Sequence, residues 1–122
     1  MKKVFTIIVT YNGSRWIDRC MQHLLQSTHP TNIIIADNAS TGDTLELLKK
    51  YAEHFTLIPL SKNLGFGGGN NAGILSALPH QPDYIFLLNQ DAYVEKECIG
   101  QLVESLEQKA DYGIVSPLQL DS

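Results

Sequence analysis

Four short polar segments of the sequence carry side chains that could bind a ligand, and each follows an apolar run. They are residues 10–14 (TYNGS), 37–41 (DNAST), 61–63 (SKN) and 89–91 (NQD). One such segment is ordinary turn chemistry, because Asn, Asp, Ser and Gly also form turns and helix caps. Four of them together indicate a binding site, provided that the apolar runs are strands ending at one edge of a sheet.

Two aspartates in these segments could do specific chemistry. Asp91 follows the apolar run 84–88, so a strand there would hold its carboxylate at the rim of the sheet. Carboxylate oxygens suit Mg²⁺ or Mn²⁺, which often keep waters and substrate phosphates among their ligands. Asp37 could accept hydrogen bonds from a base or a ribose. The ordinary alternatives are a turn or helix cap for Asp91 and an Asx turn for Asp37.

A glycine-rich segment, residues 65–73 (GFGGGNNAG), lies between the third and fourth apolar runs. We predict a loop here that leads into a helix, and its backbone amides could receive an anion. A tight, closely packed turn is the alternative. Gly67, Gly69 and Ala72 also fit the dinucleotide-binding pattern G-x-G-x-x-G/A, but residues 61–66 separate them from the strand that should immediately precede them. A dinucleotide-dependent oxidoreductase is therefore a weaker alternative.

The elements that must position these segments alternate along the chain. Apolar runs rich in β-branched residues predict five strands, at 4–9, 33–36, 55–60, 84–88 and 113–116. Apolar residues at helical spacing predict four helices between them, over 17–25 with Ser14 as its cap, 45–52, 74–78 and 99–106. The alternation predicts one α/β domain, Rossmann-like, with a mainly parallel sheet and helices on both faces. Ligands of such sheets bind at the carboxyl ends of the strands, where the polar segments lie.

The composition argues against several other classes of protein. The chain of 122 residues has a net charge of -4, which argues against nucleic acid as a partner. Cys20 and Cys98 lack the spacing of a zinc site or a disulfide scaffold, and the four histidines have no metal-ligand spacing. The apolar run near the N-terminus is too short for a signal peptide or a spanning helix, so the default compartment is the cytoplasm.

The motifs, in this order and at this spacing, resemble those of the family-2 glycosyltransferases, and most of all the bacterial rhamnosyltransferase-like branch. They are VTYN (9–12), ADNAST (36–41), NLGFGGGNNAGI (63–74) and LLNQDAYV (87–94). Each motif alone is loose, but the set is specific and covers nearly the whole chain. The resemblance implies the glycosyltransferase-A fold with strand order 3-2-1-4.

The resemblance also implies a role for individual residues. Those beside the nucleotide would be Thr10, Tyr11 and Asn12 in the nucleoside pocket, Asp37 at the base or ribose, and Gly65 and Asn71 in the glycine-rich segment. Asn89 and Asp91 occupy the place of the family's D-x-D motif, with Asn89 instead of its first acid. Asp91 would therefore bind the Mg²⁺ or Mn²⁺ that bridges the diphosphate.

The implied reaction is inverting transfer from a nucleoside-diphosphate sugar, with dTDP- and UDP-sugars as candidates, to a glycan or lipid-linked acceptor. The family's general base would lie beyond Ser122. We therefore expect residues 1–122 to be the N-terminal, donor-binding part of a longer enzyme, and to transfer sugar poorly alone. Peripheral association of the full-length protein with the inner face of the membrane, and a homodimer through an exposed sheet edge, are compatible with this view. A non-catalytic nucleotide-binding module and a purely structural interaction domain remain alternatives.

Overall fold

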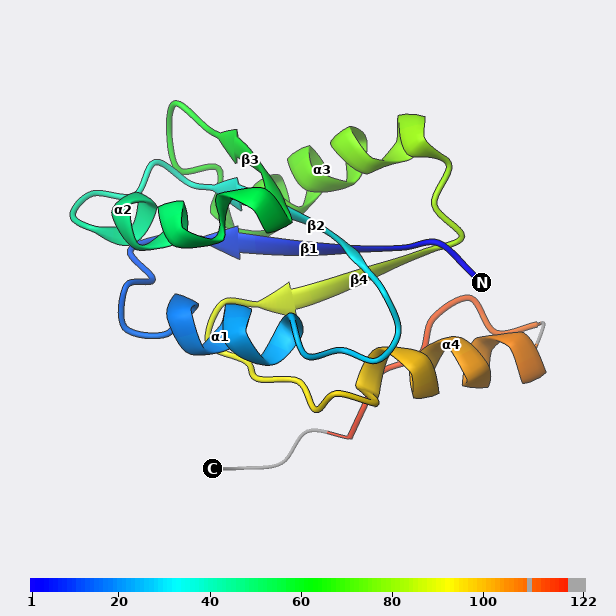
Figure 1. The fold of residues 1–122 in the computed structure, drawn as a ribbon. Coiled ribbons are helices and arrows are strands. Elements are labelled where there is room, and N and C mark those ends of the chain that lie inside the picture. Colours follow the sequence, from blue (N-terminus) through cyan, green and yellow to red (C-terminus); the bar gives the residue numbers. More distant parts are fainter. Residues whose placement is uncertain (110, 119–122) are drawn as a thin grey trace.

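The computed structural model describes residues 1–109 and 111–118 and contains a four-stranded parallel sheet (Figure 1). The strands are β1 (Val4–Thr10), β2 (Asn32–Asp37), β3 (Phe55–Pro59) and β4 (Tyr84–Asn89). Their order across the sheet is β3-β2-β1-β4, which confirms the predicted order and the α/β class. The central strand, β1, therefore has β2 on one side and β4 on the other.

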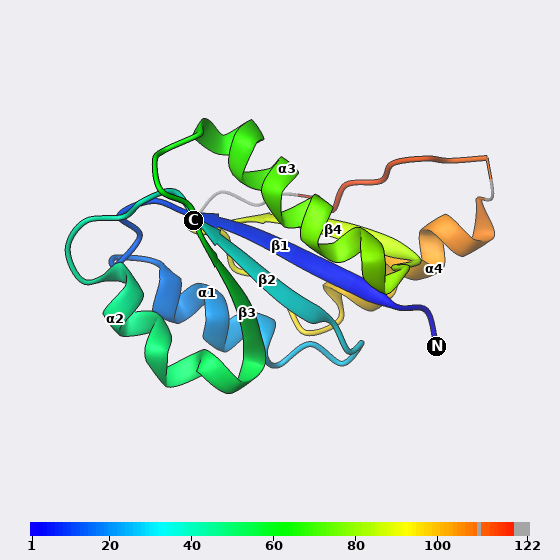
Figure 2. The ribbon, with the colours of Figure 1, turned by 90° about the horizontal axis from the view of Figure 1, so that it is seen from above.

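Helices cover both faces of the sheet, as Figures 1 and 2 show. The first face carries α1 (Ile17–Leu24), α2 (Thr44–Leu48) with the 3-10 helix η1 (Lys49–His54), and α4 (Cys98–Gln108). The second face carries α3 (Gly65–Ala77), which is followed by the 3-10 helix η2 (Leu78–His80). Side chains alternate between the two faces along each strand, so Ile8 packs in the core of the first face and Ile7 in that of the second.

The predicted first helix is present, but its predicted cap is wrong. The helix begins at Ile17, and no side chain of the described residues caps it. The backbone carbonyl of Gly13 instead accepts hydrogen bonds of 2.9 Å from the amides of Trp16 and Ile17. Ser14 thus lies in the turn before the helix. The helical segment predicted at 45–52 is also present, with an α-helical first part and a 3-10 second part.

The glycine-rich segment is helical, which corrects the predicted loop, because α3 already begins at Gly65. Two glycines one helical turn apart let the backbone of this helix approach the sheet closely. A Cβ at Gly69 would lie 2.7 Å from Cγ1 of Val9, and one at Gly73 would overlap Cγ2 of Ile7. The contact with β1 therefore outweighs the low helix propensity of glycine.

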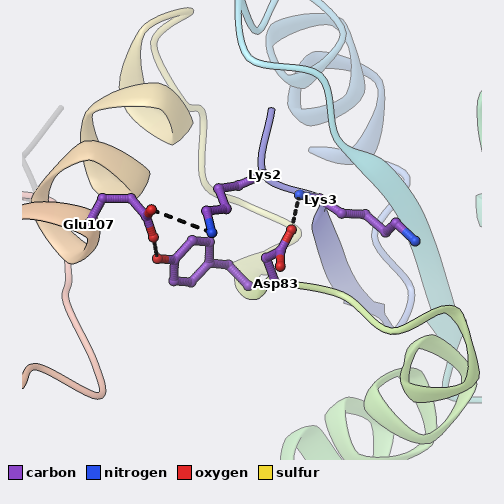
Figure 3. A network of polar contacts seen from close by, with 5 residues as sticks. Lys2, Lys3, Asp83 and Glu107 are labelled. Atoms are coloured by element: carbon purple, nitrogen blue, oxygen red, sulfur yellow. Dashed lines mark hydrogen bonds and ion pairs between the residues drawn. The ribbon is translucent and has the colours of Figure 1, made fainter. Parts of the chain in front are cut away.

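The amino end of the sheet is tied together by polar contacts, which Figure 3 shows. The backbone amide of Lys3 donates to Oδ2 of Asp83 at 2.7 Å, and Nζ of Lys2 lies 3.5 Å from Oε1 of Glu107. The hydroxyl of Tyr84 also donates to Glu107. These contacts join the start of β1 and the start of β4 to the last turns of α4.

The predicted fifth strand at 113–116 is wrong, because these residues have no strand structure. A strand needs a neighbour for its hydrogen bonds, and this segment pairs with none of the four strands of the described chain. Ile114 is 90% exposed, so an apolar run here does not signal burial.

Candidate functional site

A pocket of about 460 Å³ opens at the carboxyl edge of the sheet. The carboxyl ends of β1 and β4 point to this same side (Figure 1). The pocket is lined by Val9, Tyr11, Trp16, Asn38, Asn63, Gly65, Phe66, Asn89, Gln90 and Asp91. Its size falls within the range of roughly 300–1,000 Å³ typical of small-molecule sites. The polar segments predicted from the sequence therefore meet at one edge, around a cavity.

Asp37 holds the loops beside the pocket together. Its side chain is buried, and Oδ1 accepts hydrogen bonds of 2.6 Å from the hydroxyls of Thr10 and Ser40. Its Oδ2 accepts a bond of 2.9 Å from the backbone amide of Ser40. Asn12 extends the network, because its amide donates to Oγ of Ser40 and its Oδ1 accepts from the amide of Thr41. This carboxylate thus joins the ends of β1 and β2.

Asn38 joins the end of β2 to the start of α3. Its Oδ1 accepts a bond of 3.0 Å from the amide of Leu64, and its Nδ2 donates at 2.9 Å to the carbonyl of Gly65. Gly65 has a φ of +77°, a conformation that glycine adopts without strain. The first turn of α3, including Phe66, is thereby held at the pocket wall.

The end of β4 supplies the acidic group of the pocket. Asp91 is exposed, and the described residues give it no ion-pair partner. Burial, helped by the nearby charge of Asp91, raises the pKa of the Cys20 thiol to about 12. Among the residues that the structure describes, no group of three or more His, Cys, Asp or Glu side chains could hold a metal. Any cation held by Asp91 would need its remaining ligands from other groups, such as water or ligand oxygens.

The rest of the lining is aromatic or neutral. Tyr11 and Phe66 are 45% and 56% exposed. The guanidinium of Arg15 lies 5.8 Å from the centre of the Trp16 ring. No Lys or Arg of the described chain is among the lining residues. An anionic ligand with several charges would therefore find aromatic surface and amides here, but no cationic side chain from the described lining.

The predicted site residues divide into two groups. Tyr11, Gly65, Asn89 and Asp91 line the pocket. The others are Thr10, Asn12 and Asp37, which form the network behind it, and Asn71, which is exposed on α3. Six lining residues were not individually predicted as site residues: Val9, Trp16, Asn38, Asn63, Phe66 and Gln90. Five of the six, all except Trp16, lie within the predicted motifs, so membership of a motif was an available signal.

Comparison with known protein families decides the family. The profile described as "Glycosyl transferase family 2" matches residues 6–119. The chain belongs to this family. Among curated glycosyltransferases, the O-antigen chain rhamnosyltransferase WbaN of Salmonella anatum is 31% identical over 95% of this chain. The galactofuranosyltransferase GlfT1 of Mycobacterium tuberculosis is 26% identical over 96% of it. The chain spans 37% and 40% of the length of these two relatives.

Solved glycosyltransferase structures share the fold. TarS of Staphylococcus aureus in complex with UDP-GlcNAc matches with a TM-score of 0.80 at 20% identity, over 95% of this chain and 37% of the TarS chain. The mannosyltransferase PcManGT of Pyrobaculum calidifontis, in complex with GDP-Man and Mn²⁺, matches with a TM-score of 0.74 at 21% identity, over 86% of this chain and 32% of the other. The predicted glycosyltransferase-A fold is thereby confirmed.

Within residues 1–109 and 111–118, none of the helices has both the length and the apolar character needed to cross a membrane.

Proposed function

We propose that this chain is the donor-binding domain of a glycosyltransferase, and that it binds a nucleoside-diphosphate sugar together with Mg²⁺ or Mn²⁺. One observation carries the proposal: an exposed, unpaired carboxylate, Asp91, lies in a pocket whose described lining includes no cationic side chain. A diphosphate placed here needs charge compensation, and a divalent cation on Asp91 would supply it. Such cations are commonly held by one or two carboxylates together with substrate phosphates.

The remaining residues fit the parts of such a donor. Tyr11, Trp16 and Phe66 offer aromatic faces, against which a base can stack. Asn89 offers an amide group of the kind that binds the base, ribose or sugar by hydrogen bonds, whereas the amide of Asn38 is buried and already bonded to Leu64 and Gly65. Three predicted contact residues take an indirect role in this proposal. Thr10, Asn12 and Asp37 act through the loops that they hold, because the carboxylate oxygens of Asp37 already accept bonds from protein groups.

The proposed reaction is inverting transfer of the sugar to a glycan or lipid-linked acceptor. When bound, the cation would act as a Lewis acid on the leaving diphosphate. Asp91 would fix the position of the cation, and the aromatic residues would exclude water from the base of the nucleotide. Asp91 is the only carboxylate among the lining residues of the described chain, so no second acid is left there to serve as general base. We therefore expect residues 1–122 to bind the donor without appreciable transfer.

Donor identity and cellular context are part of the proposal. Relatives bind different nucleotides, since the TarS structure holds UDP-GlcNAc and the PcManGT structure GDP-Man. We propose a dTDP- or UDP-sugar, in keeping with the rhamnosyltransferase relative. We place the full-length protein in the cytoplasm, peripherally at the inner face of the membrane, where lipid-linked acceptors are available. A homodimer through the outer edge of β4 also belongs to this proposal.

Calorimetric titration of the chain with UDP and dTDP tests the proposal, first with Mn²⁺ and then with excess EDTA. Asp91→Asn should weaken binding in Mn²⁺ by at least about tenfold, because a charged ligand of the cation is lost, and should change little in EDTA. Glu53→Gln is the matched control, since Glu53 is also exposed but lies at the opposite edge of the sheet. A folded chain that binds neither nucleotide, or binds one equally well in EDTA, would contradict the proposal.

A further inference from the structure

The side chain of Gln90 pairs with the backbone of Tyr11 in the manner of a neighbouring strand. Its Oε1 accepts a hydrogen bond of 3.1 Å from the Tyr11 amide. Its Nε2 donates one of 3.1 Å to the Tyr11 carbonyl. One side chain therefore satisfies both backbone groups of a residue 79 positions away. A two-point contact of this kind fixes orientation as well as distance.

The loop after β1 leaves room for this side chain. A Cβ built on Gly13 would overlap Oε1 of Gln90 and would lie 2.8 Å from its Cδ. The three nearest atoms to that position all belong to Gln90, and Gly13 has no positive φ. The backbone conformation at Gly13 therefore tolerates alanine, and the position of Gln90 is what a methyl group there would disturb.

The contact links the two halves of the pocket. Val9 pairs with Asn89, so the loops that follow β1 and β4 leave the sheet side by side. Tyr11 is on the first loop, and Asp91 follows Gln90 directly on the second. The Gln90 clamp, as we call the two hydrogen bonds between Gln90 and Tyr11, sets the position of one loop against the other.

We propose that Gln90 is a positioning residue that couples nucleotide binding to cation binding. The inference rests on the proposed function, in which the nucleoside lies against Tyr11 and the cation on Asp91. A nucleoside diphosphate must reach both places at once. Two sites held at a fixed separation bind the two ends of one ligand without the cost of ordering the loops during binding. Cation and nucleotide then strengthen each other's binding by the same factor.

The clamp itself can be tested without any ligand. The Tyr11 amide should exchange its hydrogen slowly in the wild-type chain, and at least about tenfold faster in Gln90→Ala, because it loses its acceptor. Gln101→Ala is the matched control, since Gln101 is an exposed glutamine on α4 outside the pocket. An unchanged exchange rate in Gln90→Ala would overturn the clamp, whatever the chain binds.

The coupling is measured as the ratio of the Kd for UDP in EDTA to the Kd in Mn²⁺, with dTDP titrated in parallel. We expect this ratio to fall by about tenfold in Gln90→Ala, the order expected when two neutral hydrogen bonds are lost. Gly13→Ala should produce a similar fall by displacing the same side chain. The double variant should fall no further than either single variant, because both changes remove one contact.

The outcomes separate the inference from the proposed function. Equal weakening of UDP in EDTA and in Mn²⁺ would make Gln90 a direct nucleotide contact, and would overturn the coupling while the donor site stands. Additive losses in the double variant would also overturn it. If the folded wild-type chain binds neither nucleotide, the proposed function fails and the coupling fails with it, whereas amide exchange at Tyr11 still decides whether the clamp exists.

Discussion

Replacing Gly73 by alanine should destabilise the domain, although the same change in most helices is stabilising. The added methyl would overlap Cγ2 of Ile7 and lie 3.4 Å from its Cδ1. Ile7 is fully buried on the central strand, and its β-branched side chain has little freedom to rotate away. Either α3 must move outward or Ile7 must leave its preferred rotamer.

The size of the effect follows from two opposed contributions. Overpacking of a core costs about 1–3 kcal/mol, and the fully buried partner places Gly73 near the upper end of that range. Alanine regains roughly 1 kcal/mol of helix propensity. The net loss should be about 2 kcal/mol. For a domain of this size, about 1 kcal/mol lowers Tm by about 4 °C, so Tm should fall by about 8 °C.

Thermal and urea unfolding followed by circular dichroism measure this loss. Gly67→Ala is the control on the same helix, because a Cβ there meets no atom of the described residues within 4 Å. It should leave the stability unchanged or raise it by up to about 1 kcal/mol. Ile7→Ala combined with Gly73→Ala should lose less than the sum of the single losses, since the smaller side chain makes room for the methyl. A Gly73→Ala variant as stable as wild type, or strict additivity with Ile7→Ala, would refute this reasoning.

Three further predictions concern other parts of the chain. Asp37→Asn should lower the free energy of unfolding, measured in urea, by about 2 kcal/mol, because a buried acceptor of several hydrogen bonds becomes partly a donor. A loss below about 0.5 kcal/mol would contradict this prediction. Cys20 should react with iodoacetamide at pH 8 more slowly than the less buried Cys98, as mass spectrometry can show, because burial raises the pKa of Cys20 to about 12; equal rates would count against this. The hydrogen bond from Lys50 lowers the pKa of the Asp18 carboxyl in the folded chain. The ionised Asp18 therefore contributes slightly to stability above its unfolded pKa, and this contribution is lost as the pH falls through its folded pKa. Lys50→Ala should therefore raise the pKa of Asp18 in an NMR titration, and an unchanged value would show that the pair does not form in solution.

The sequence was sufficient for the sheet because its signals are local and strong. The runs at β1 and β2 are apolar on both faces, as buried parallel strands require. The convergence of the polar segments then follows from parallel topology alone. The prediction of a fifth strand was wrong because a strand needs a neighbouring strand to pair with, and an apolar run does not show whether one is present. The predicted start of α3 was wrong because residues 65–73 are helical through their contact with the sheet and not through their helix propensity.

The division of the site residues has a simple geometric cause. Successive residues of a strand point to opposite faces. Val9 and Asn38 share the face of α3, where the pocket opens, whereas Thr10 and Asp37 end their strands toward the other face and bond to each other. Counting from the buried positions of each strand would have separated the lining residues from the supporting ones.

The central position of β1 also determines when the site can form during synthesis. The two strands that flank β1 lie at different distances from it along the chain. Strand β2 begins at Asn32, after a single helix, whereas β4 begins only at Tyr84. The first half of a nascent chain can pair β1 with β2, but it leaves the other edge of β1 and the backbone of Tyr11 open to water. The pocket closes only after residues 89–91 have left the ribosome. A ribosome stalled before this point should therefore present a chain that is partly folded but unable to bind its ligand, and binding should appear in one step as β4 emerges.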